Sequence, residues 1–236
     1  KLDIPSFEDA PGTRSYMVSV MSLLLLAIRF GEVRLQYTMD QAMAYREDIK
    51  NQGRVLRTLL PQMEENCAEI AEIWKDFPCY DFVGAGFDYA TAWFGHAKIL
   101  EATGKFAMHI NTEEWFHLNF FARNARELGT VVVANTTNPC HSRSKELVKY
   151  ANELHRPLVV ITDGDASDFN YEEATYVRVP KPEYPITMPI THFVPVCLIA
   201  AYIAEIIDEK YGRGCEGDWA FSEGGACVKN SKIIVD

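Results

Sequence analysis

Apolar residues follow two different periods along the chain. In the first third they recur at helical spacing, in a strongly apolar run at 17–28 and in longer stretches at 36–52 and 54–74. Beyond residue 79, short apolar runs that are typical of buried strands alternate with helical stretches. We expect strands at 80–83, 106–110, 131–134, 158–162 and 174–179, and helices at 89–100, 144–154 and 184–207. This alternation predicts a parallel sheet with helices on both faces and ligands bound beyond the carboxyl ends of its strands.

The apolar run at 17–28 reads MVSVMSLLLLAI and lies between Arg14 and Arg29. It is shorter than the roughly 20 residues that a membrane span needs. We therefore predict a buried helix and no membrane partner. The chain begins at Lys1 without an initiator methionine or a targeting segment, so we expect the natural N-terminus to lie upstream.

Composition narrows the class of protein. The 236 residues are 48% hydrophobic and 24% charged, which is typical of a soluble globular protein. A net charge of -10 argues against nucleic acid as a partner, and an anionic ligand would need local basic groups or helix N-termini. The six cysteines form no C-x-x-C pair, so we expect free thiols in a reducing cytoplasm and no metal. A disulfide or metal site at Cys215 and Cys227 is the alternative.

The segment 81–117 carries the most specific pattern. A strand leads through Gly84-Ala85-Gly86 into a helix, and a second strand follows. Asn111 and Glu114 then have capping-box spacing for a helix that carries Trp115, Phe116 and His117. A glycine turn between strand and helix is also found in nucleotide-dependent oxidoreductases, which remain one alternative. Tyr89 stands where the third glycine of that motif is required, so we expect no cofactor.

The ordered positions of this segment resemble the sugar isomerase (SIS) family, most closely the second SIS domain of glucosamine-6-phosphate synthases. The matching residues are Gly84, Gly86, Tyr89, Ala92, Gly95, Lys98, Glu101, Glu114 and His117. The resemblance covers the chain from about Cys67 onward. It implies an α/β fold: a three-layer αβα sandwich around a mostly parallel, about five-stranded flavodoxin-like sheet, with additional N-terminal helices.

The same resemblance divides the chain. It implies that 1–35 is the tail of a preceding SIS domain, 36–76 a linker with lead-in helices, 77–211 the SIS domain, and 212–236 a glycine-rich C-terminal tail. The chain departs from the synthase pattern at four places. That pattern has proline at Ala90, glutamate at Phe94, alanine at His96, and His-Gly-Pro where residues 117–119 read His-Leu-Asn.

Aldose–ketose interconversion needs an acid/base pair, because a ring must open and a proton must move between neighbouring carbons. The resemblance implies that Glu101 moves the carbon proton and that His117 assists ring opening from a neighbouring subunit. It also implies an imine-forming lysine near the C-terminus, for which Lys229 and Lys232 are candidates. The structural alternatives are a surface ion pair of Glu101 with Lys98 and a core histidine at His117.

Substrate-binding residues are expected in three places. The glycine turn contributes Gly84, Gly86 and Tyr89, and the resemblance adds Thr13, which sits where the family has a Ser-Thr-Lys run. The loop at 135–145, which joins a predicted strand to the following helix, is a candidate phosphate site. Its candidate ligands are Thr136, Thr137, Ser142 and Ser144. Either serine could instead cap the following helix.

The preferred hypothesis is a phosphosugar enzyme that acts through an enediol or enolamine intermediate. It would be an aldose–ketose isomerase or a fructosamine-6-phosphate deglycase. The deglycase is somewhat favoured, because the chain has no glutaminase-like segment that would make it a complete glutamine-dependent synthase. The alternative is a non-catalytic sugar-phosphate-binding module with a regulatory or structural role. In either case we expect a homodimer or a higher homo-oligomer.

Overall fold

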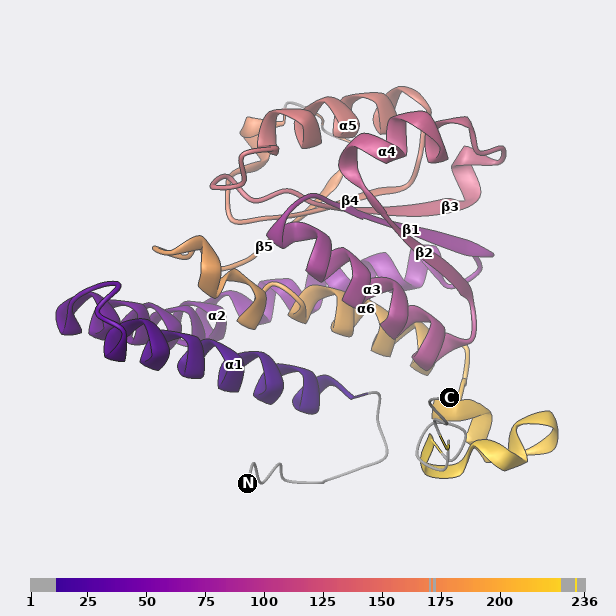
Figure 1. The fold of residues 1–236 in the computed structure, drawn as a ribbon. Coiled ribbons are helices and arrows are strands. Elements are labelled where there is room, and N and C mark those ends of the chain that lie inside the picture. Colours follow the sequence, from indigo (N-terminus) through magenta and orange to yellow (C-terminus); the bar gives the residue numbers. More distant parts are fainter. Residues whose placement is uncertain (1–11, 170, 172, 226–231, 233–236) are drawn as a thin grey trace.

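A computed structural model describes residues 12–169, 171, 173–225 and 232 (Figure 1). Its centre is a parallel sheet in the order β2-β1-β3-β4-β5. The strands are β1 (Cys79–Gly84), β2 (Phe106–Asn111), β3 (Leu128–Val133), β4 (Leu158–Thr162) and β5 (Thr175–Arg178). This is the flavodoxin-like order that the sequence predicted.

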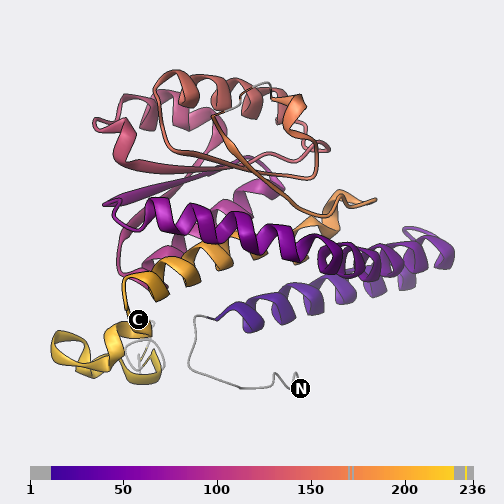
Figure 2. The ribbon, with the colours of Figure 1, turned by 180° about the vertical axis from the view of Figure 1, so that it is seen from behind.

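Helices cover both faces of the sheet (Figures 1 and 2). On one face lie α2 (Met39–Trp74), α3 (Phe87–Thr103) and α6 (Val194–Ile206), whose apolar sides form one core with the sheet. On the other face lie α4 (Thr112–His117) and α5 (His141–Glu153), which form a second core. Short 3-10 helices connect these elements: η1 (Asn119–Phe121), η2 (Ala125–Glu127), η3 (Ala166–Asp168), η4 (Pro185–Ile190), η5 (Tyr211–Cys215) and η6 (Gly217–Gly225).

The lead-in region is one continuous helix. Thr38 caps α2 by accepting a hydrogen bond from the Gln41 amide at 3.2 Å, and the helix then runs for 36 residues past Gly53 and Pro61. The sequence predicted two stretches with a break near Gly53. A glycine weakens a helix by only about 1 kcal/mol, and packing of the C-terminal half of α2 on α6 and the sheet outweighs this cost.

The apolar N-terminal helix α1 (Thr13–Val33) corrects the prediction of a buried helix. Ile28 is its only buried residue in the described structure, whereas Leu23 is 67% and Phe30 is 59% exposed. Helix α1 lies against α2 and η4 and leaves its other side uncovered (Figure 1). By length and apolar character, α1 and the segment Pro185–Ile206 could each cross a membrane, with 6% and 61% of the respective windows buried.

A buried ion pair ties the layers together at β1. Arg156 donates to Asp81 Oδ2 at 2.9 Å and to Thr130 Oγ1 at 3.2 Å, and its other terminal nitrogen donates to the Asn119 carbonyl. Both side chains of the ion pair are almost inaccessible to water. Burial raises the pKa of Asp81, and Arg156 opposes that rise. The pair therefore fixes the β4 entry, β1 and β3 relative to one another.

We predict that Arg156→Met lowers the free energy of unfolding by about 3–5 kcal/mol, because it leaves the Asp81 carboxylate buried without its cation. Urea denaturation would measure this loss. The matched control is Arg178→Met, since Arg178 pairs with Asp165 on the surface and should contribute below about 1 kcal/mol. Equal losses in the two variants would contradict a structural role for the buried pair.

Candidate functional site

Helix α3 separates the predicted site residues into two groups. Gly86 precedes its first turn and Glu101 lies near its last turn. At 1.5 Å per residue these positions are about 20 Å apart along the helix axis. A single hexose phosphate is shorter than this distance, so it cannot contact both. The residues predicted as one site therefore occupy two places.

The first place is the carboxyl edge of the sheet. Gly84 ends β1 where a Cβ atom would come within 2.6 Å of the Asp88 carbonyl oxygen, and Gly86 adopts φ +54°, which favours glycine. Asp88 follows in the first turn of α3 and is fully buried. Its carboxylate accepts hydrogen bonds from the Asn135 amide at 3.1 Å, the Asn135 side chain at 2.5 Å and the Asn138 side chain at 2.8 Å. These hydrogen bonds join the segment that follows the glycine turn to the loop at 135–145, which follows β3.

Two buried acids from neighbouring elements, Asp88 of α3 and Asp163 after β4, lie beside the loop at 135–145. Burial raises the pKa of Asp88 to about 6, and the charge of nearby Asp163 adds to this rise. Asp163 accepts from the Thr136 amide at 2.7 Å, and it is itself buried. Arg143 turns away to Glu113, at 2.7 Å, and to Glu146. This charge distribution disfavours a phosphate at the loop.

The remaining predicted residues of this edge have local roles. Thr137 and Gly86 line a cavity of about 500 Å³ together with Asn138 and Met188. The N-cap of α5 is Cys140, whose amide donates to Asn138 Oδ1 at 2.9 Å, so the alternative that Ser142 or Ser144 is the cap is wrong. Ser144 is buried and donates to the Cys140 carbonyl at 3.5 Å.

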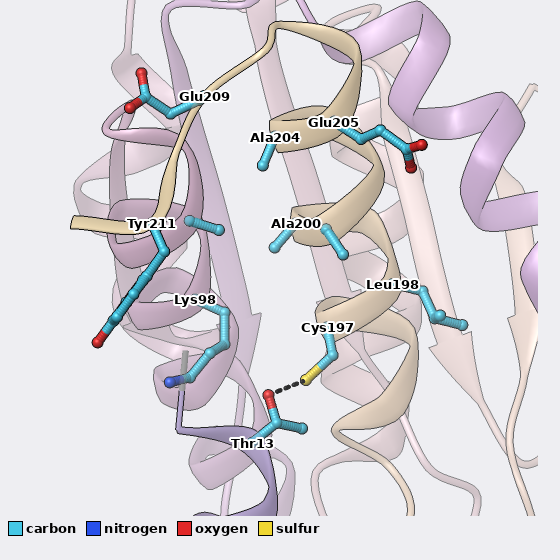
Figure 3. A pocket seen from close by; sticks show the side chains of 11 residues that line it. Thr13, Lys98, Cys197, Leu198, Ala200, Ala204, Glu205, Glu209 and Tyr211 are labelled. Carbon is cyan, nitrogen blue, oxygen red and sulfur yellow. Dashed lines mark hydrogen bonds between the residues drawn. The ribbon is translucent and has the colours of Figure 1, made fainter. Parts of the chain in front are cut away.

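The second place is the space between α1, α3 and α6 (Figure 3). Lys98 projects into it from α3 with 8% of its side chain exposed, and donates to Glu101 Oε2 at 2.5 Å. The Lys98 ammonium also lies 4.9 Å from the centre of the Phe94 ring. Thr13, in the first turn of α1, contacts the Cys197 sulfur at 3.8 Å. Thr13 and Glu101 are thus predicted site residues that the fold brings to one region.

Two cavities meet at Lys98. One has a volume of about 440 Å³ and a floor of small α6 residues, Ala200, Ala201 and Ala204, with Thr13 and Tyr211 at its sides. The other has a volume of about 750 Å³ and is lined by Lys98, Glu101, Gly12 and Ser15, among others. The Lys98–Glu101 ion pair therefore lies where the two cavities meet, with the Lys98 side chain buried and the Glu101 side chain 42% exposed.

Arg213 fixes the end of α3 that carries Glu101. It donates to the Glu101 carbonyl at 2.7 Å and to the Leu100 carbonyl at 3.4 Å. Both carbonyls lie in the last turn of the helix. The Leu100 carbonyl also accepts a hydrogen bond from the Gly104 amide at 3.1 Å. The contact brings η5, and with it Tyr211, to the cavity rim.

The predicted acid/base pair is not assembled within one chain. His117 lies on α4, on the opposite face of the sheet from α3 (Figure 1). Its imidazole is 65% exposed and contacts Glu113 at 3.2 Å. The alternative of a core histidine is therefore wrong, and His117 could reach a Glu101 carboxylate only in another chain.

The other candidates lie outside the two places. Tyr89 is half-buried on α3, with its ring centre 5.2 Å from that of His109. Lys232 is exposed, while Lys229 and Cys227 lie outside the described residues. Cys215 ends η5. Among the residues that the structure describes, no group of three or more histidines, cysteines or acids could hold a metal ion.

Several residues that line these two regions were not identified as site residues from the sequence. Asp88 could have been found, because an acid in the first turn after a glycine turn is placed to accept backbone and loop donors. Ser15 and Tyr16 could not, because they reach the Glu101 region only through the tertiary packing of α1 on α3.

No family model matches the sequence, and no curated protein is significantly similar to it. Solved structures are similar to it in fold. The C-terminal domain of glucosamine-fructose-6-phosphate aminotransferase from Francisella tularensis is 18% identical with a TM-score of 0.76, over 86% of this chain and 56% of that one. Tagatose-6-phosphate ketose/aldose isomerase from Escherichia coli is 12% identical with a TM-score of 0.59, over 71% and 45%.

A regulatory protein has the same fold. The sugar isomerase domain of an RpiR transcription factor from Sphaerobacter thermophilus is 19% identical with a TM-score of 0.53, over 70% of this chain and 90% of that one. This chain thus spans just over half of the Francisella chain and less than half of the Escherichia coli chain. The strand order, the helix layers and these likenesses together show that the chain has the fold of the sugar isomerase (SIS) domains.

Proposed function

We propose that this chain is the SIS domain of a phosphosugar enzyme, either an aldose–ketose isomerase or a fructosamine-6-phosphate deglycase. The observation that carries this proposal is the Lys98–Glu101 pair, which borders two cavities beside the first turn of α1. A carboxylate that is held by a neighbouring ammonium and open to a cavity is a suitable acid/base for moving a carbon-bound proton.

The phosphate of the substrate would bind at the first turn of α1. Helix α1 has 21 residues, no acid in its first turn and no side-chain cap at Gly12. Its N-terminus carries the positive end of the helix dipole, and the hydroxyls of Thr13 and Ser15 lie beside the two cavities. Because the chain as a whole is strongly acidic, a local positive field of this kind is required for an anion.

Glu101 would remove the proton next to the substrate carbonyl and return it to the neighbouring carbon. Negative charge develops on the carbonyl oxygen during this step. Lys98 is placed to donate to that oxygen, because its ammonium contacts the Glu101 carboxylate and both residues line the larger cavity. Both reactions share this step, since an enediol and an enolamine form by the same proton removal.

His117 would assist ring opening from a second copy of the chain. Its position across the sheet from Glu101 requires a neighbour if the two are to share a substrate, so we propose a homodimer. Lys229 or Lys232 would supply the imine-forming amine. Both follow η5, which contacts the end of α3 near Glu101.

We further propose that 1–35 closes a preceding SIS domain, with 36–76 as linker, 77–211 as the second SIS domain and 212–236 as its tail. The support is the exposed apolar side of α1, which another domain would cover. We also propose a cytoplasmic protein, which agrees with the free thiols of Cys67, Cys79, Cys140 and Cys197.

The second candidate function is a non-catalytic sugar-phosphate sensor. It is favoured by the likeness to the RpiR sugar isomerase domain and by the separation of His117 from Glu101 within the chain. Such a protein would bind a sugar phosphate without exchanging its carbon-bound protons.

We predict that Glu101→Gln in the full-length protein lowers turnover at least about 100-fold and keeps substrate affinity, because the amide cannot accept the carbon proton. NMR would follow solvent deuterium entering the first and second sugar carbons of fructose 6-phosphate and of fructosamine 6-phosphates. The matched control is Glu153→Gln, since Glu153 also lies on a helix beside a lysine, with Lys149 at 3.9 Å. Full exchange in Glu101→Gln would remove the proposed role, and binding without exchange in the wild type would favour the sensor.

We predict that inactive Glu101→Gln and His117→Asn chains complement each other. Randomly mixed dimers should regain about a quarter of wild-type activity, because half are hybrids and each hybrid has one site with both native residues. Differently tagged chains and native mass spectrometry would verify the mixing. Confirmed hybrids that stay inactive would rule out a shared site.

A further inference from the structure

The larger cavity beside Lys98 is a groove with a polar end and an apolar end. Lys98, Glu101 and Ser15 line the polar end, and the groove then follows α3 towards its N-terminal half. The lining residues there are Ala90, Trp93, Phe94 and Ala97 from α3, Tyr16, Ser19 and Val20 from α1, and Pro189. At about 1.5 Å per residue, the α3 wall between Ala90 and Glu101 is about 16 Å long. This length leaves room for a second chemical group beyond a hexose phosphate.

An aromatic cluster fixes the shape of the groove between the two helices. The ring of Tyr16 lies 4.1 Å from that of Phe94 and 5.2 Å from that of Phe193, measured between centres. Phe94 and Phe193 are 5.4 Å apart in an edge-on arrangement. These contacts join α1, α3 and the start of α6, so this part of the groove is preformed.

Trp93 is an exposed aromatic platform on the α3 wall. Its side chain lines the groove and the residue is 58% exposed. The indole stacks on His109 with ring centres 5.6 Å apart and an interplanar angle of 17°, and His109 stacks in turn on His96 at 4.4 Å. Burial, followed by the neighbouring His96, lowers the pKa of His109, so its imidazole is uncharged at neutral pH. His109 thus covers one face of the Trp93 indole, and the other face is available to stack on a flat apolar group.

The groove has no unpaired cation in its described lining to attract an anionic substituent. Its described charged lining residues are Lys98 and Glu101, which pair with each other at the polar end. Phe94 stands where the synthase pattern has glutamate, so this chain has an aromatic ring at a position that would otherwise carry a carboxylate. A carboxylate bound near Trp93 would find no cation in the described lining except Lys98, which is already paired with Glu101.

We propose that this groove binds an apolar, aromatic amine substituent of a fructosamine 6-phosphate, with Trp93 as its stacking platform. The inference rests on the proposed function, because it places the sugar phosphate at the polar end, near Glu101 and the first turn of α1. The amine substituent of a fructosamine is attached at the first sugar carbon, next to the carbonyl where Glu101 would act. It therefore extends from the reacting end of the sugar into the groove.

The test compares two synthetic fructosamine 6-phosphates, one made from benzylamine and one from ethanolamine, with fructose 6-phosphate as the reference. Isothermal titration calorimetry would measure their dissociation constants in full-length Glu101→Gln protein, in which turnover is blocked. Trp93→Ala would be introduced into the same background. Trp219→Ala is the matched control, because Trp219 is also exposed, at 50%, but lies in η6 outside the groove.

We expect the benzylamine compound to bind at least about tenfold more tightly than the ethanolamine compound, because of aromatic stacking and burial of apolar area. Trp93→Ala should reduce this preference to within about twofold and leave fructose 6-phosphate affinity unchanged, while Trp219→Ala should preserve the preference. Equal affinities in the parent protein, as expected if another domain fills the groove, would overturn the inference. So would a preference that survives Trp93→Ala. If fructose 6-phosphate binds but the benzylamine and ethanolamine compounds bind equally well, the inference fails and the proposed function stands. If no sugar phosphate binds, both fail.

Discussion

The close approach of α3 to the sheet is the constraint on which the candidate site depends. A Cβ atom at Gly95 would lie 2.5 Å from the Phe82 ring of β1 and 3.2 Å from Val196 of α6. The absence of a side chain at this one position lets α3 pack against the sheet and α6 at the same time. Lys98 follows one turn later and is thereby placed in the narrow space that α6 and the start of α1 enclose. A larger residue at Gly95 would move the wall that carries both Lys98 and Glu101.

Much of the fold could be predicted from the sequence because its strands are short, apolar and fully buried. The strand at 158–162 was predicted with the bounds that the structure has, and α3 extends the predicted helix by two or three residues at each end. Helix α1 was predicted as buried because its residues are apolar. Composition indicates what a residue prefers to contact, but which residues are buried depends on tertiary packing. Its 21 apolar-rich residues lie at the margin of the described structure, with one side uncovered.

The site was harder to predict because spacing along the chain does not give distance in space. Gly86 and Glu101 belong to one ungapped motif, yet a straight helix holds them about 20 Å apart. Conversely, Thr13 is 88 positions before Glu101 in the sequence, and the two residues lie beside cavities that share Lys98. A local pattern can therefore identify the helix that carries the chemistry, but not the elements that complete its pocket.

The charges at the two ends of α3 determine where an anion can bind. The carboxyl edge of a parallel sheet ordinarily attracts phosphate, because loop amides and helix N-termini converge there. In this chain Asp88 and Asp163 accept those amides, and the two buried carboxylates make the edge unfavourable for a further negative charge. At the other end of α3, the first turn of α1 contains no acid and Lys98 contributes a cation, while Glu101, Glu205 and Glu209 also line the two cavities. Under the proposed function, an anionic substrate would therefore have to bind at the first turn of α1 and Lys98, with the acids of the cavities facing its uncharged groups.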